Sequence, residues 1–441
     1  MCDVFLVNPP ISNIVELYQQ NRSSPPLGLA YIGATLIENN IDVAAIDMNV
    51  PSVDFSVLET RLSEEQPRIV GISTYTETYS NALRIGRMAK KVNPSVVIVM
   101  GGPHVTFLPC NAVEVPEVDI AVRNEGEITM LELARYFRDG FGSLDEIKGV
   151  TFMRDGKCIS TPPRQLINDL DSLPFPASHI FPLSQYQYPI NISSARGCPY
   201  KCIFCAAGAM SGNSYRLRTP ENVIDELTQS FERYRFQFFT FVDDTFSAFP
   251  DRTQKVCDLI KESGINAQWQ CSTRVDGVAK NRDVLRRMAD AGCKTITFGV
   301  ESGSQSILNS IKKGTTIEQV KKGVKWTLEL GMNAYCSFII PHPEDTVETV
   351  LQTKKLMVEL LKSGAVVSIS FTVPFPGTYL YEHMRELGVT ALSKNWDDFS
   401  TSREPIISTK HLSLETIKSL HNGIVSTLNE KQRELRENVL K

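Results

Sequence analysis

The chain has 441 residues, of which 42% are apolar and 22% are charged, so it is long enough to bury more than one hydrophobic core. Its formal net charge of −4 gives no electrostatic case for binding nucleic acid. The first ten residues lack the basic and apolar stretches of a secretory signal, and no apolar run is long enough to span a membrane. Ten cysteines spread over this length do not indicate a disulfide framework, so we expect a cytoplasmic protein in a reducing compartment.

Residues 1–145 alternate short apolar runs with amphipathic helical stretches, which predicts an α/β domain built on a doubly wound parallel sheet, of the Rossmann-like kind. The strands are predicted at 4–7, 43–46, 69–72, 96–100 and 118–122, and the helices at 29–38, 80–91 and 130–137. Ligands of such sheets bind beyond the carboxyl ends of the strands.

Residues 146–185 are predicted to form a hairpin and a proline-rich linker. Two alternating runs flank Asp155-Gly156, which is a strong hairpin turn signal, and six prolines then interrupt a stretch with little periodicity. We place the boundary between the linker and the next domain near residue 185.

Residues 186–385 resume the alternation in six strand–helix units, which predicts a partial (β/α)6 barrel that is open on one side. The strands are predicted at 190–194, 238–242, 267–272, 295–300, 334–340 and 366–373, and the helices at 220–234, 252–263, 281–291, 317–330 and 346–363. Residues 386–441 carry apolar positions at helical spacing, so we expect a C-terminal helical extension that packs on the barrel.

Turn-forming residues follow the predicted strands of the first domain, where a ligand would bind. Because glycine has no side chain, it lets a large cofactor approach the backbone at such an edge. The residues concerned are Ser73, Thr74 and Tyr75 after the third strand, Gly101 and Gly102 after the fourth, and Glu125 and Gly126 after the fifth. His104 follows the glycine pair, and we interpret it as a hydrogen-bonding residue rather than a metal ligand.

Cys198, Cys202 and Cys205 form a CxxxCxxC motif directly after the first predicted barrel strand. Soft thiolates at this spacing suit zinc or an iron–sulfur cluster. A structural zinc site needs four ligands, and no further cysteine or histidine lies inside or directly beside the motif. The motif therefore indicates a metal site with one open position, although three buried structural cysteines are the alternative.

The cysteine motif resembles the signature of radical S-adenosylmethionine (radical SAM) enzymes. The resemblance implies that Cys198, Cys202 and Cys205 bind three irons of a 4Fe-4S cluster and that S-adenosylmethionine chelates the fourth iron. It also implies reductive cleavage of S-adenosylmethionine to a 5'-deoxyadenosyl radical. Phe204, just before the last cysteine, would then pack near the adenine, with ordinary core packing as its alternative.

The resemblance implies further cofactor-binding residues at the ends of the barrel strands. Asp243 and Asp244 would bind the amino group of S-adenosylmethionine, unless they cap the next helix. Ser272 and Arg274 would contact its ribose or carboxylate, unless Arg274 pairs with Asp276 or with a glutamate on the next strand.

Glu301, in the run Gly-Val-Glu-Ser-Gly, would accept hydrogen bonds from the ribose hydroxyls and is the other possible partner of Arg274. Residues 341–346 read Pro-His-Pro-Glu-Asp-Thr where relatives often read Gly-Leu-Pro-Gly-Glu-Thr. His342 is therefore a candidate catalytic acid or base on the substrate side, with a neutral loop residue as the alternative. The basic pair Lys312-Lys313 is interpreted as part of a solvated helix face.

The first domain resembles the cobalamin-binding domain that precedes the radical SAM barrel in one large subfamily. The matching residues are Pro26, Leu27 and Gly28, Ser73, the pair Gly101-Gly102, and the turn at Glu125 and Gly126. The DxHxxG motif, whose histidine binds cobalt from below in other cobalamin proteins, is absent after the first strand. Many radical SAM members lack it and are thought to hold cobalamin with no protein ligand, so we predict cobalamin; a domain kept only as a fold is the alternative.

These resemblances imply an enzyme with a 4Fe-4S cluster, S-adenosylmethionine and cobalamin, which methylates an unactivated carbon of a small-molecule substrate. A radical cyclase, dehydratase or rearrangement enzyme without methyl transfer is the alternative. A methylthiotransferase would need further cluster cysteines near the N-terminus, and a non-catalytic sensor would not need the motifs at the strand ends. The expected partners are the substrate and a reductant such as flavodoxin or ferredoxin.

Overall fold

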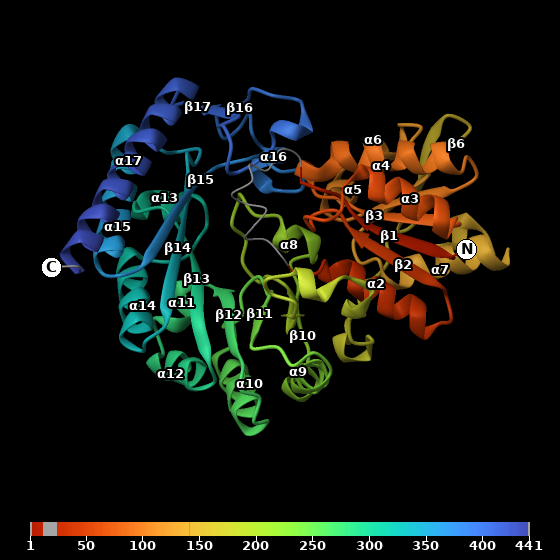
Figure 1. Cartoon of the computed structure of the whole chain (residues 1–441). Helices are drawn as coiled ribbons and strands as arrows, with labels where there is room; N and C mark the ends of the chain where they lie inside the picture. The colour runs from red at the N-terminus through yellow and green to blue at the C-terminus, as the bar shows by residue number, and fades with distance from the viewer. Residues whose placement is uncertain (1, 12–23, 141, 440–441) are drawn as a thin grey trace. The chain divides into compact units, whose positions relative to one another are not determined.

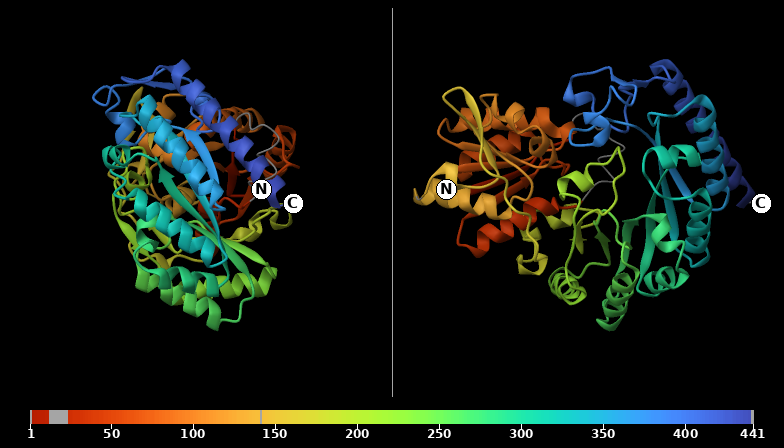
Figure 2. Two further views of the ribbon diagram at one scale, coloured as in Figure 1. Left: turned by 90° about the vertical axis from the view of Figure 1, so that its left-hand side faces the viewer. Right: turned by 180° about the vertical axis from the view of Figure 1, so that it is seen from behind.

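The computed structural model describes residues 2–11, 24–140 and 142–439 and divides the chain into two units, Met1–Asn191 and Ile192–Lys441. Figure 1 shows the elements of both units, and Figure 2 shows them from two further sides. The first unit extends beyond the boundary that we expected at residue 185. Among the helices of the described ranges, none has the length and apolar character needed to cross a bilayer.

Unit 1 contains a seven-stranded sheet in the order β2-β1-β3-β4-β5-β6-β7. Its strands are β1 (Val4–Asn8), β2 (Val43–Asp47), β3 (Ile69–Ser73), β4 (Val97–Gly101), β5 (Ile120–Val122), β6 (Val150–Arg154) and β7 (Lys157–Ser160). The pairs from β2 to β5 are parallel, as predicted, and these strands consist mainly of buried apolar residues. The β6–β7 hairpin pairs antiparallel with β5, so it extends this sheet instead of belonging to a separate linker.

Helices cover both faces of the unit 1 sheet, with α2 and α7 on one face and α3 to α6 on the other (Figure 1). Their bounds are α2 (Leu27–Glu38), α3 (Phe55–Glu65), α4 (Tyr79–Val92), α5 (Pro103–Phe107), α6 (Pro109–Val113) and α7 (Glu127–Asp139). We did not predict α3, because only Leu58 and Leu62 on it are buried and the rest of its sequence is largely polar. Its first turn is capped by Asp54, whose carboxylate accepts from the N–H groups of Ser56 and Val57.

The proline-rich stretch packs on unit 1 through three short 3₁₀ helices. They are η3 (Leu170–Ser172), η4 (Ser178–Ile180) and η5 (Leu183–Gln185); η1 (Thr76–Thr78) and η2 (Leu144–Glu146) lie earlier in the chain. Leu170 packs against Tyr31 of α2, and the Tyr186 hydroxyl donates to Asp47 Oδ2 at 3.0 Å. These contacts explain why the unit boundary falls later than the sequence pattern indicated.

Cys110 of α6 and Cys158 of β7 form a disulfide, although we did not expect one. The two residues are 48 positions apart in the sequence, and they meet because the hairpin folds back beside α6. The remaining cysteines are free thiols, which include all three of the CxxxCxxC motif.

Unit 2 contains a six-stranded sheet in the order β15-β14-β13-β12-β11-β8, with parallel pairs from β11 to β15. Its strands are β8 (Asn191–Ile192), β11 (Phe238–Phe241), β12 (Gln268–Thr273), β13 (Cys293–Glu301), β14 (Asn333–Ile340) and β15 (Val366–Phe371). The intervening helices are α9 (Pro220–Tyr234), α10 (Pro250–Glu262), α12 (Arg282–Asp290), α14 (Ile317–Glu329) and α15 (Val347–Lys362), and they lie outside the sheet (Figure 1). Because β8 and β15 are opposite edges, the barrel is open, as predicted.

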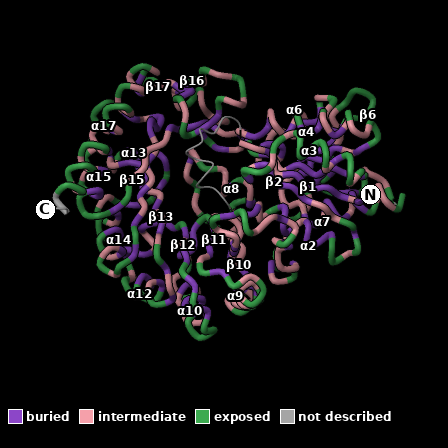
Figure 3. The backbone as a smooth tube through the Cα atoms, in the orientation of Figure 1, coloured by how far each residue is buried: buried purple, intermediate pink, exposed green. Residues whose placement is uncertain are grey.

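The core of unit 2 follows its strands, which appear as the buried part of the tube in Figure 3. Phe241 and Trp269 of neighbouring strands meet edge to face, with ring centroids 5.2 Å apart, and Phe246 packs against both. All three side chains are at most 1% exposed. This cluster fixes the β11–β12 end of the sheet.

Shorter elements that we did not predict are inserted around this barrel. They are β9 (Ala195–Gly197), α8 (Ala207–Met210), β10 (Tyr215–Leu217), α11 (Val275–Val278), α13 (Gln305–Ser310), α16 (Tyr379–Glu382), β16 (Val389–Ala391), η6 (Trp396–Asp398) and β17 (Ile407–Thr409). The chain ends in α17 (Leu414–Val439), which lies along α15 (Figure 1) and buries Ile417 and Ile424. The C-terminal helix therefore packs on the barrel, as predicted.

Candidate active site

The three motif cysteines lie in the loop of the β9–β10 hairpin, directly after the first barrel strand. Gly197, at the base of the hairpin, has φ +92°, and a Cβ there would lie 2.3 Å from the Ser214 carbonyl oxygen. Only glycine fits this position without displacing backbone. The two ends of the segment 198–214 are therefore held together, and the cysteines lie on a closed loop.

The thiols lie near enough that, besides burial, the charge of Cys202 raises the pKa of Cys198, and the charges of Cys202 and Cys198 raise the pKa of Cys205. Burial raises the pKa of Cys198, and it raises the pKa of Cys205 to about 11, so metal binding must supply the energy to deprotonate these thiols. Within the described ranges, no three His, Cys, Asp or Glu side chains converge as the ligands of one metal ion do. The donor set fits a cluster, because cluster cysteines bind different irons, whereas it lacks the fourth ligand of a structural zinc site.

Arg274, after β12, holds the cysteine loop in place. Its guanidinium lies 3.7 Å from the centroid of the Tyr200 ring, and its Nη1 lies 3.8 Å from Cys202 Sγ. It also forms the ion pair with Asp276 that we considered as an alternative, with Nε 3.0 Å from Oδ1. Arg274 therefore places positive charge beside a cysteine that must become a thiolate.

Backbone hydrogen bonds anchor the same loop from two further elements. Ile203 N donates to Ile311 O at 3.2 Å, and Leu380 N donates to Ile203 O at 2.9 Å. The next residue, Phe204, packs against both of the apolar clusters that these contacts join. The cysteine loop is thus fixed by the barrel rather than free to move.

The two adjacent aspartates after β11 differ in their surroundings. Asp243 is 3% exposed, and its Oδ1 accepts from the N–H groups of Ser194 and Ala195 at 2.7 and 3.1 Å. Asp244 is exposed on the surface. Its pKa is nevertheless raised to about 6, mainly because the surrounding protein desolvates the carboxylate and secondly because of the negative charge of Asp243. The charge of Asp244 acts in turn on Cys198 and Cys205, so it is the aspartate available to an ammonium group beside the cysteines.

Neither aspartate caps the following helix, which was the alternative interpretation. The N-cap residue of α10 is Phe249, and no side chain caps that helix. Burial also raises the pKa of Asp243, against the hydrogen bonds from Ser194 and the charge of Arg252. Asp243 is consequently part of the protein's internal hydrogen bonding.

Glu301 ends β13 in a strained conformation, with φ +70° and a β-bulge between Gly299 and Glu301. Lys313 Nζ donates to its Oε1 at 2.8 Å, and both side chains are 7% exposed. A Cβ on Gly299 would lie 2.4 Å from the same oxygen, so glycine there makes room for the ion pair. One carboxylate oxygen of Glu301 is thus engaged with Lys313.

Lys313 was missed by the sequence analysis, which interpreted Lys312-Lys313 as a solvated helix face. That interpretation was wrong for Lys313, which is 6% exposed and lies in a loop between α13 and α14. The sequence does contain one signal, because Gly314 interrupts the helical periodicity directly after Lys313. In the structure Gly314 has φ +70°, which is incompatible with a helix. Because a loop residue does not follow the helical alternation of buried and exposed positions, the side chain of Lys313 can point into the protein.

His342 is fully buried at the end of β14, with its ring centroid 5.6 Å from that of Phe204. In the described part of the chain, neither of its ring nitrogens has a hydrogen-bond partner, although the Glu301 backbone lies near. Burial, with a smaller effect of the Lys313 charge, lowers its pKa to about 4, so the ring is neutral near pH 7. An unpartnered buried imidazole is costly unless a ligand hydrogen-bonds it.

Lys313 contacts three of the residues that were predicted to bind S-adenosylmethionine, namely Phe204, Arg274 and Glu301. Its Nζ lies 6.0 Å from the centroid of the Phe204 ring, its carbonyl accepts from Arg274, and it pairs with Glu301. Ser272 is exposed on β12, and its carbonyl accepts from Phe246 N at 3.0 Å. The structure does not place Ser272 among the residues around Lys313.

In unit 1, the neighbouring strands β3 and β4 end side by side, with Ser73 paired to Gly101. Thr74 donates through both its N–H and its hydroxyl to Gly101 O, each at 2.7 Å. Gly102 has φ +103°, and a Cβ there would lie 2.6 Å from Thr74 O. Ser73 is half-buried at the end of β3, and Tyr75 is 57% exposed. The backbone at Gly101 and Gly102 therefore packs closely against Thr74, and the exposed Tyr75 ring follows directly in the chain.

Of the other residues predicted to bind cobalamin in unit 1, some contact neighbouring residues of the protein and Gly28 lies on the surface. Glu125 accepts from Ile167 N at 2.7 Å, and a Cβ on Gly126 would lie 2.9 Å from a side-chain carbon of Ile32. Gly28, at the start of α2, is exposed, and no atom of the described residues lies within 4 Å of the position of a Cβ there. Leu27 packs against the cluster of Tyr31, Leu170 and Leu173. The space at Gly28 is thus open to a ligand.

His104 is 1% exposed, stacks on Tyr79 with ring centroids 4.2 Å apart, and bonds Thr76 Oγ1 through Nδ1 at 3.2 Å. It therefore serves as a hydrogen-bonding residue in the core, and not as a metal ligand at the edge. A cobalamin bound at the carboxyl ends of β3 and β4 would therefore have no cobalt ligand from His104.

Two family models match the chain: the radical SAM superfamily over residues 192–357 and the B12 binding domain over residues 22–134. The chain therefore belongs to the radical SAM superfamily. Over 422 residues it is 35% identical to an uncharacterized methyltransferase of Pyrococcus horikoshii, an alignment that covers 95% of this chain and 90% of the relative. It is a member of the B12-binding branch of radical SAM enzymes, whose cofactors are a 4Fe-4S cluster, S-adenosylmethionine and cobalamin.

A second relative is the anaerobic magnesium-protoporphyrin IX monomethyl ester cyclase of Rubrivivax gelatinosus, which is 30% identical over 75% of this chain and 61% of its own length. Two solved structures share the fold. The methyltransferase TsrM of Kitasatospora setae, with cobalamin and a [4Fe-4S] cluster bound, has a TM-score of 0.72 at 18% identity and aligns over 89% of this chain and 81% of its own. OxsB, with aqua-cobalamin and S-adenosylmethionine bound, has a TM-score of 0.77 at 19% identity and aligns over 97% and 66%.

Proposed function

We propose that the protein is a cobalamin-dependent radical SAM methyltransferase that acts on an unactivated carbon of a small molecule. The proposal rests on the anchored loop with one exposed and two half-buried thiols, on the same chain as a domain whose described residues leave space beside Gly28. The full-length similarity to a methyltransferase supports methyl transfer as the outcome.

The residues around the loop have distinct proposed roles. Cys198, Cys202 and Cys205 hold three irons, and Asp244 accepts hydrogen bonds from the ammonium group of S-adenosylmethionine. Arg274 stabilises the thiolate of Cys202. When bound, the cofactors supply a 5'-deoxyadenosyl radical and a methyl group.

The buried residues beyond the loop complete the proposed pocket. Glu301, oriented by Lys313, accepts from ribose hydroxyls, and Phe204 packs against the adenine. His342 is neutral, so it offers one N–H donor and one acceptor to an adenosyl or substrate group. The roles of Ser73, Thr74, Tyr75 and the glycines of unit 1 in holding cobalamin belong to the same proposal.

A radical cyclase without methyl transfer is the second candidate, because the chain is 30% identical to a cyclase. For either reaction we propose a small-molecule substrate in the cytoplasm and a low-potential reductant such as flavodoxin or ferredoxin.

One experiment separates these candidates. The anaerobically reconstituted protein is reduced and incubated with hydroxocobalamin, S-adenosylmethionine labelled with deuterium on the methyl group, and a small-molecule fraction of cell extract. A methyltransferase yields 5'-deoxyadenosine, S-adenosylhomocysteine and a labelled product. A cyclase yields 5'-deoxyadenosine with no labelled product, and the absence of 5'-deoxyadenosine with an intact cluster would rule out both reactions.

A further inference from the structure

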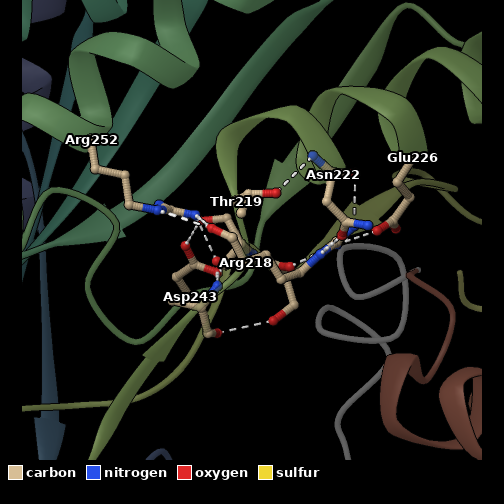
Figure 4. Close-up of polar contacts among 9 residues, drawn as sticks. Arg218, Thr219, Asn222, Glu226, Asp243 and Arg252 are labelled. Atoms are coloured by element: carbon tan, nitrogen blue, oxygen red, sulfur yellow. Dashed lines mark hydrogen bonds and ion pairs between the residues drawn. The ribbon is translucent and has the colours of Figure 1, made fainter. Parts of the chain in front are cut away.

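The backbone just before the cysteine motif is held by charged side chains from three other elements (Figure 4). In the segment 193–195, the N–H groups of Ser194 and Ala195 donate to Asp243. Arg252 Nη2 donates to Ser194 O at 2.8 Å, and Arg218 Nη1 donates to Ser193 O at 3.0 Å. Four backbone groups of three consecutive residues are thus fixed by side chains.

These side chains form one connected set, which we name the charge clamp: the buried residues Arg218, Glu226 and Asp243 and the half-buried Arg252. Arg218 forms an ion pair with Glu226, and their side chains are 4% and 2% exposed. Two positive and two negative charges balance one another. Buried ion pairs of this kind add little net stability compared with apolar residues, yet removing one partner is costly. A role in fixing a particular geometry is the better explanation for three buried charges and a half-buried one.

The clamp holds both ends of the loop that carries the cysteines. Arg218 directly follows β10, its N–H donates to Ser194 O at 3.1 Å, and its carbonyl accepts from Arg252 Nη2 at 2.9 Å. The segment 193–195 leads into β9, whose last residue, Gly197, directly precedes Cys198. A shift of the clamp would therefore move the first cysteine.

We propose that the charge clamp is a positioning device for the cluster loop and that Asp243 acts through the backbone rather than by contacting S-adenosylmethionine. Asp243 uses both carboxylate oxygens internally, since its Oδ2 accepts from the Ser194 hydroxyl while Oδ1 accepts from two N–H groups. Its neighbour Asp244 is exposed, and its carboxylate accepts no hydrogen bond from the residues that the structure describes. The inference rests on the proposed cluster role of the cysteines and assigns different functions to two adjacent aspartates.

Four single variants of the full-length, anaerobically reconstituted protein test this division. Asp243→Asn and Arg252→Lys weaken the clamp, and Asp244→Asn removes the exposed carboxylate. Asp258→Asn is the matched control, because Asp258 forms an exposed ion pair with Arg287 on the neighbouring helices, with 44% and 45% exposure. Iron content, the electron paramagnetic resonance spectrum of the reduced cluster without S-adenosylmethionine, and the dissociation constant for S-adenosylmethionine are measured for each.

The clamp variants should bind less iron and show an altered cluster spectrum before S-adenosylmethionine is added. Their affinity for S-adenosylmethionine, corrected for intact cluster, should stay within about threefold of the original protein. Asp244→Asn should keep the iron and the spectrum but bind S-adenosylmethionine about tenfold or more weakly, because it loses a charge-assisted contact. The Asp258→Asn control should match the original protein in all three measurements.

Two results would contradict the positioning role of the clamp. If Asp243→Asn keeps full iron and an unchanged spectrum but binds S-adenosylmethionine weakly, Asp243 is a direct ligand and the proposal fails. If that variant does not fold, Arg252→Lys provides the test. It keeps the positive charge but loses the guanidinium hydrogen bonds to Ser194 O and Arg218 O. An unchanged cluster spectrum in this variant overturns the proposal. Failure of the unaltered protein to bind any cluster would instead contradict the proposed function itself.

Discussion

The buried ion pair between Lys313 and Glu301 shows how single residues shape the site. The pair lies at a strained β-bulge, and the glycine at 299 leaves the space that the two side chains fill. The break in helical periodicity at Gly314 was the one sequence signal that Lys313 lies in a loop, but its contact with Glu301 depends on how that loop turns inward. Contacts between individual side chains, such as this ion pair, are therefore known only from the tertiary structure.

Replacing Lys313 with Met should destabilise unit 2 by about 3–5 kcal/mol, because it leaves Glu301 buried without a partner. Urea unfolding followed by tryptophan fluorescence measures this directly, since all three tryptophans, Trp269, Trp326 and Trp396, lie in unit 2. The matched change Lys321→Met, in an exposed pair with Glu359, should cost at most about 1 kcal/mol. Equal losses in the two variants would contradict the role of burial.

His104 gives unit 1 a defined pH dependence. Burial lowers its pKa from an ordinary value of 6.5 to about 4, so the folded state holds the neutral ring. As pH falls from 6.5 towards 4, the unfolded chain binds a proton that the folded chain does not, and the free energy of unfolding decreases by up to about 3 kcal/mol. The stabilisation is fully present above pH 6.5.

The variant His104→Gln removes this titration. In urea unfolding followed by circular dichroism, after the fluorescence-detected transition of unit 2 is subtracted, the original protein should lose stability relative to the variant between pH 6.5 and 4. Parallel pH profiles for the two proteins would show that His104 does not titrate differently on folding.

Among the elements, the strands of the two main sheets were predicted to within one or two residues, whereas the strands of the two small sheets, β9, β10, β16 and β17, were missed. Buried parallel strands form continuous apolar runs that can be located without knowing their neighbours. The hairpin β6–β7 was also located, but its pairing with β5 was not, because a local turn signal does not specify which edge the hairpin joins. The strands β9 and β10 have three residues each, too few for a periodic pattern.

The docking of α17 on α15 gives a test at this scale. Ile424 is 1% exposed, so Ile424→Ala should destabilise unit 2 by about 2–5 kcal/mol through lost burial and the cavity left behind. The control Val347→Ala, at a 46% exposed position of α15, should change stability by no more than about 0.5 kcal/mol. Tryptophan fluorescence during urea unfolding reads out both, and a neutral Ile424→Ala would show that the helix is not packed.

At the scale of the whole molecule, the two units carry separate cofactor sites on one chain. The cysteines lie in unit 2, whereas the B12 binding match lies in unit 1. Replacing Cys198, Cys202 and Cys205 with Ala should therefore abolish the iron–sulfur absorbance while the protein still takes up hydroxocobalamin stoichiometrically. An intact cluster in this variant would refute the assignment of the ligands, and loss of cobalamin uptake would refute the independence of the sites.

The amino-acid sequence by itself determined the metal-binding motif, the class of chemistry and the alternation that builds two α/β units. These features are local, because thiolate spacing and apolar periodicity can be recognised within a few residues of each other. Only the tertiary structure decided which of Asp243 and Asp244 is available to a ligand. That choice depends on hydrogen bonds between residues 49 positions apart, which form because the order of the strands brings Ser194 beside Asp243.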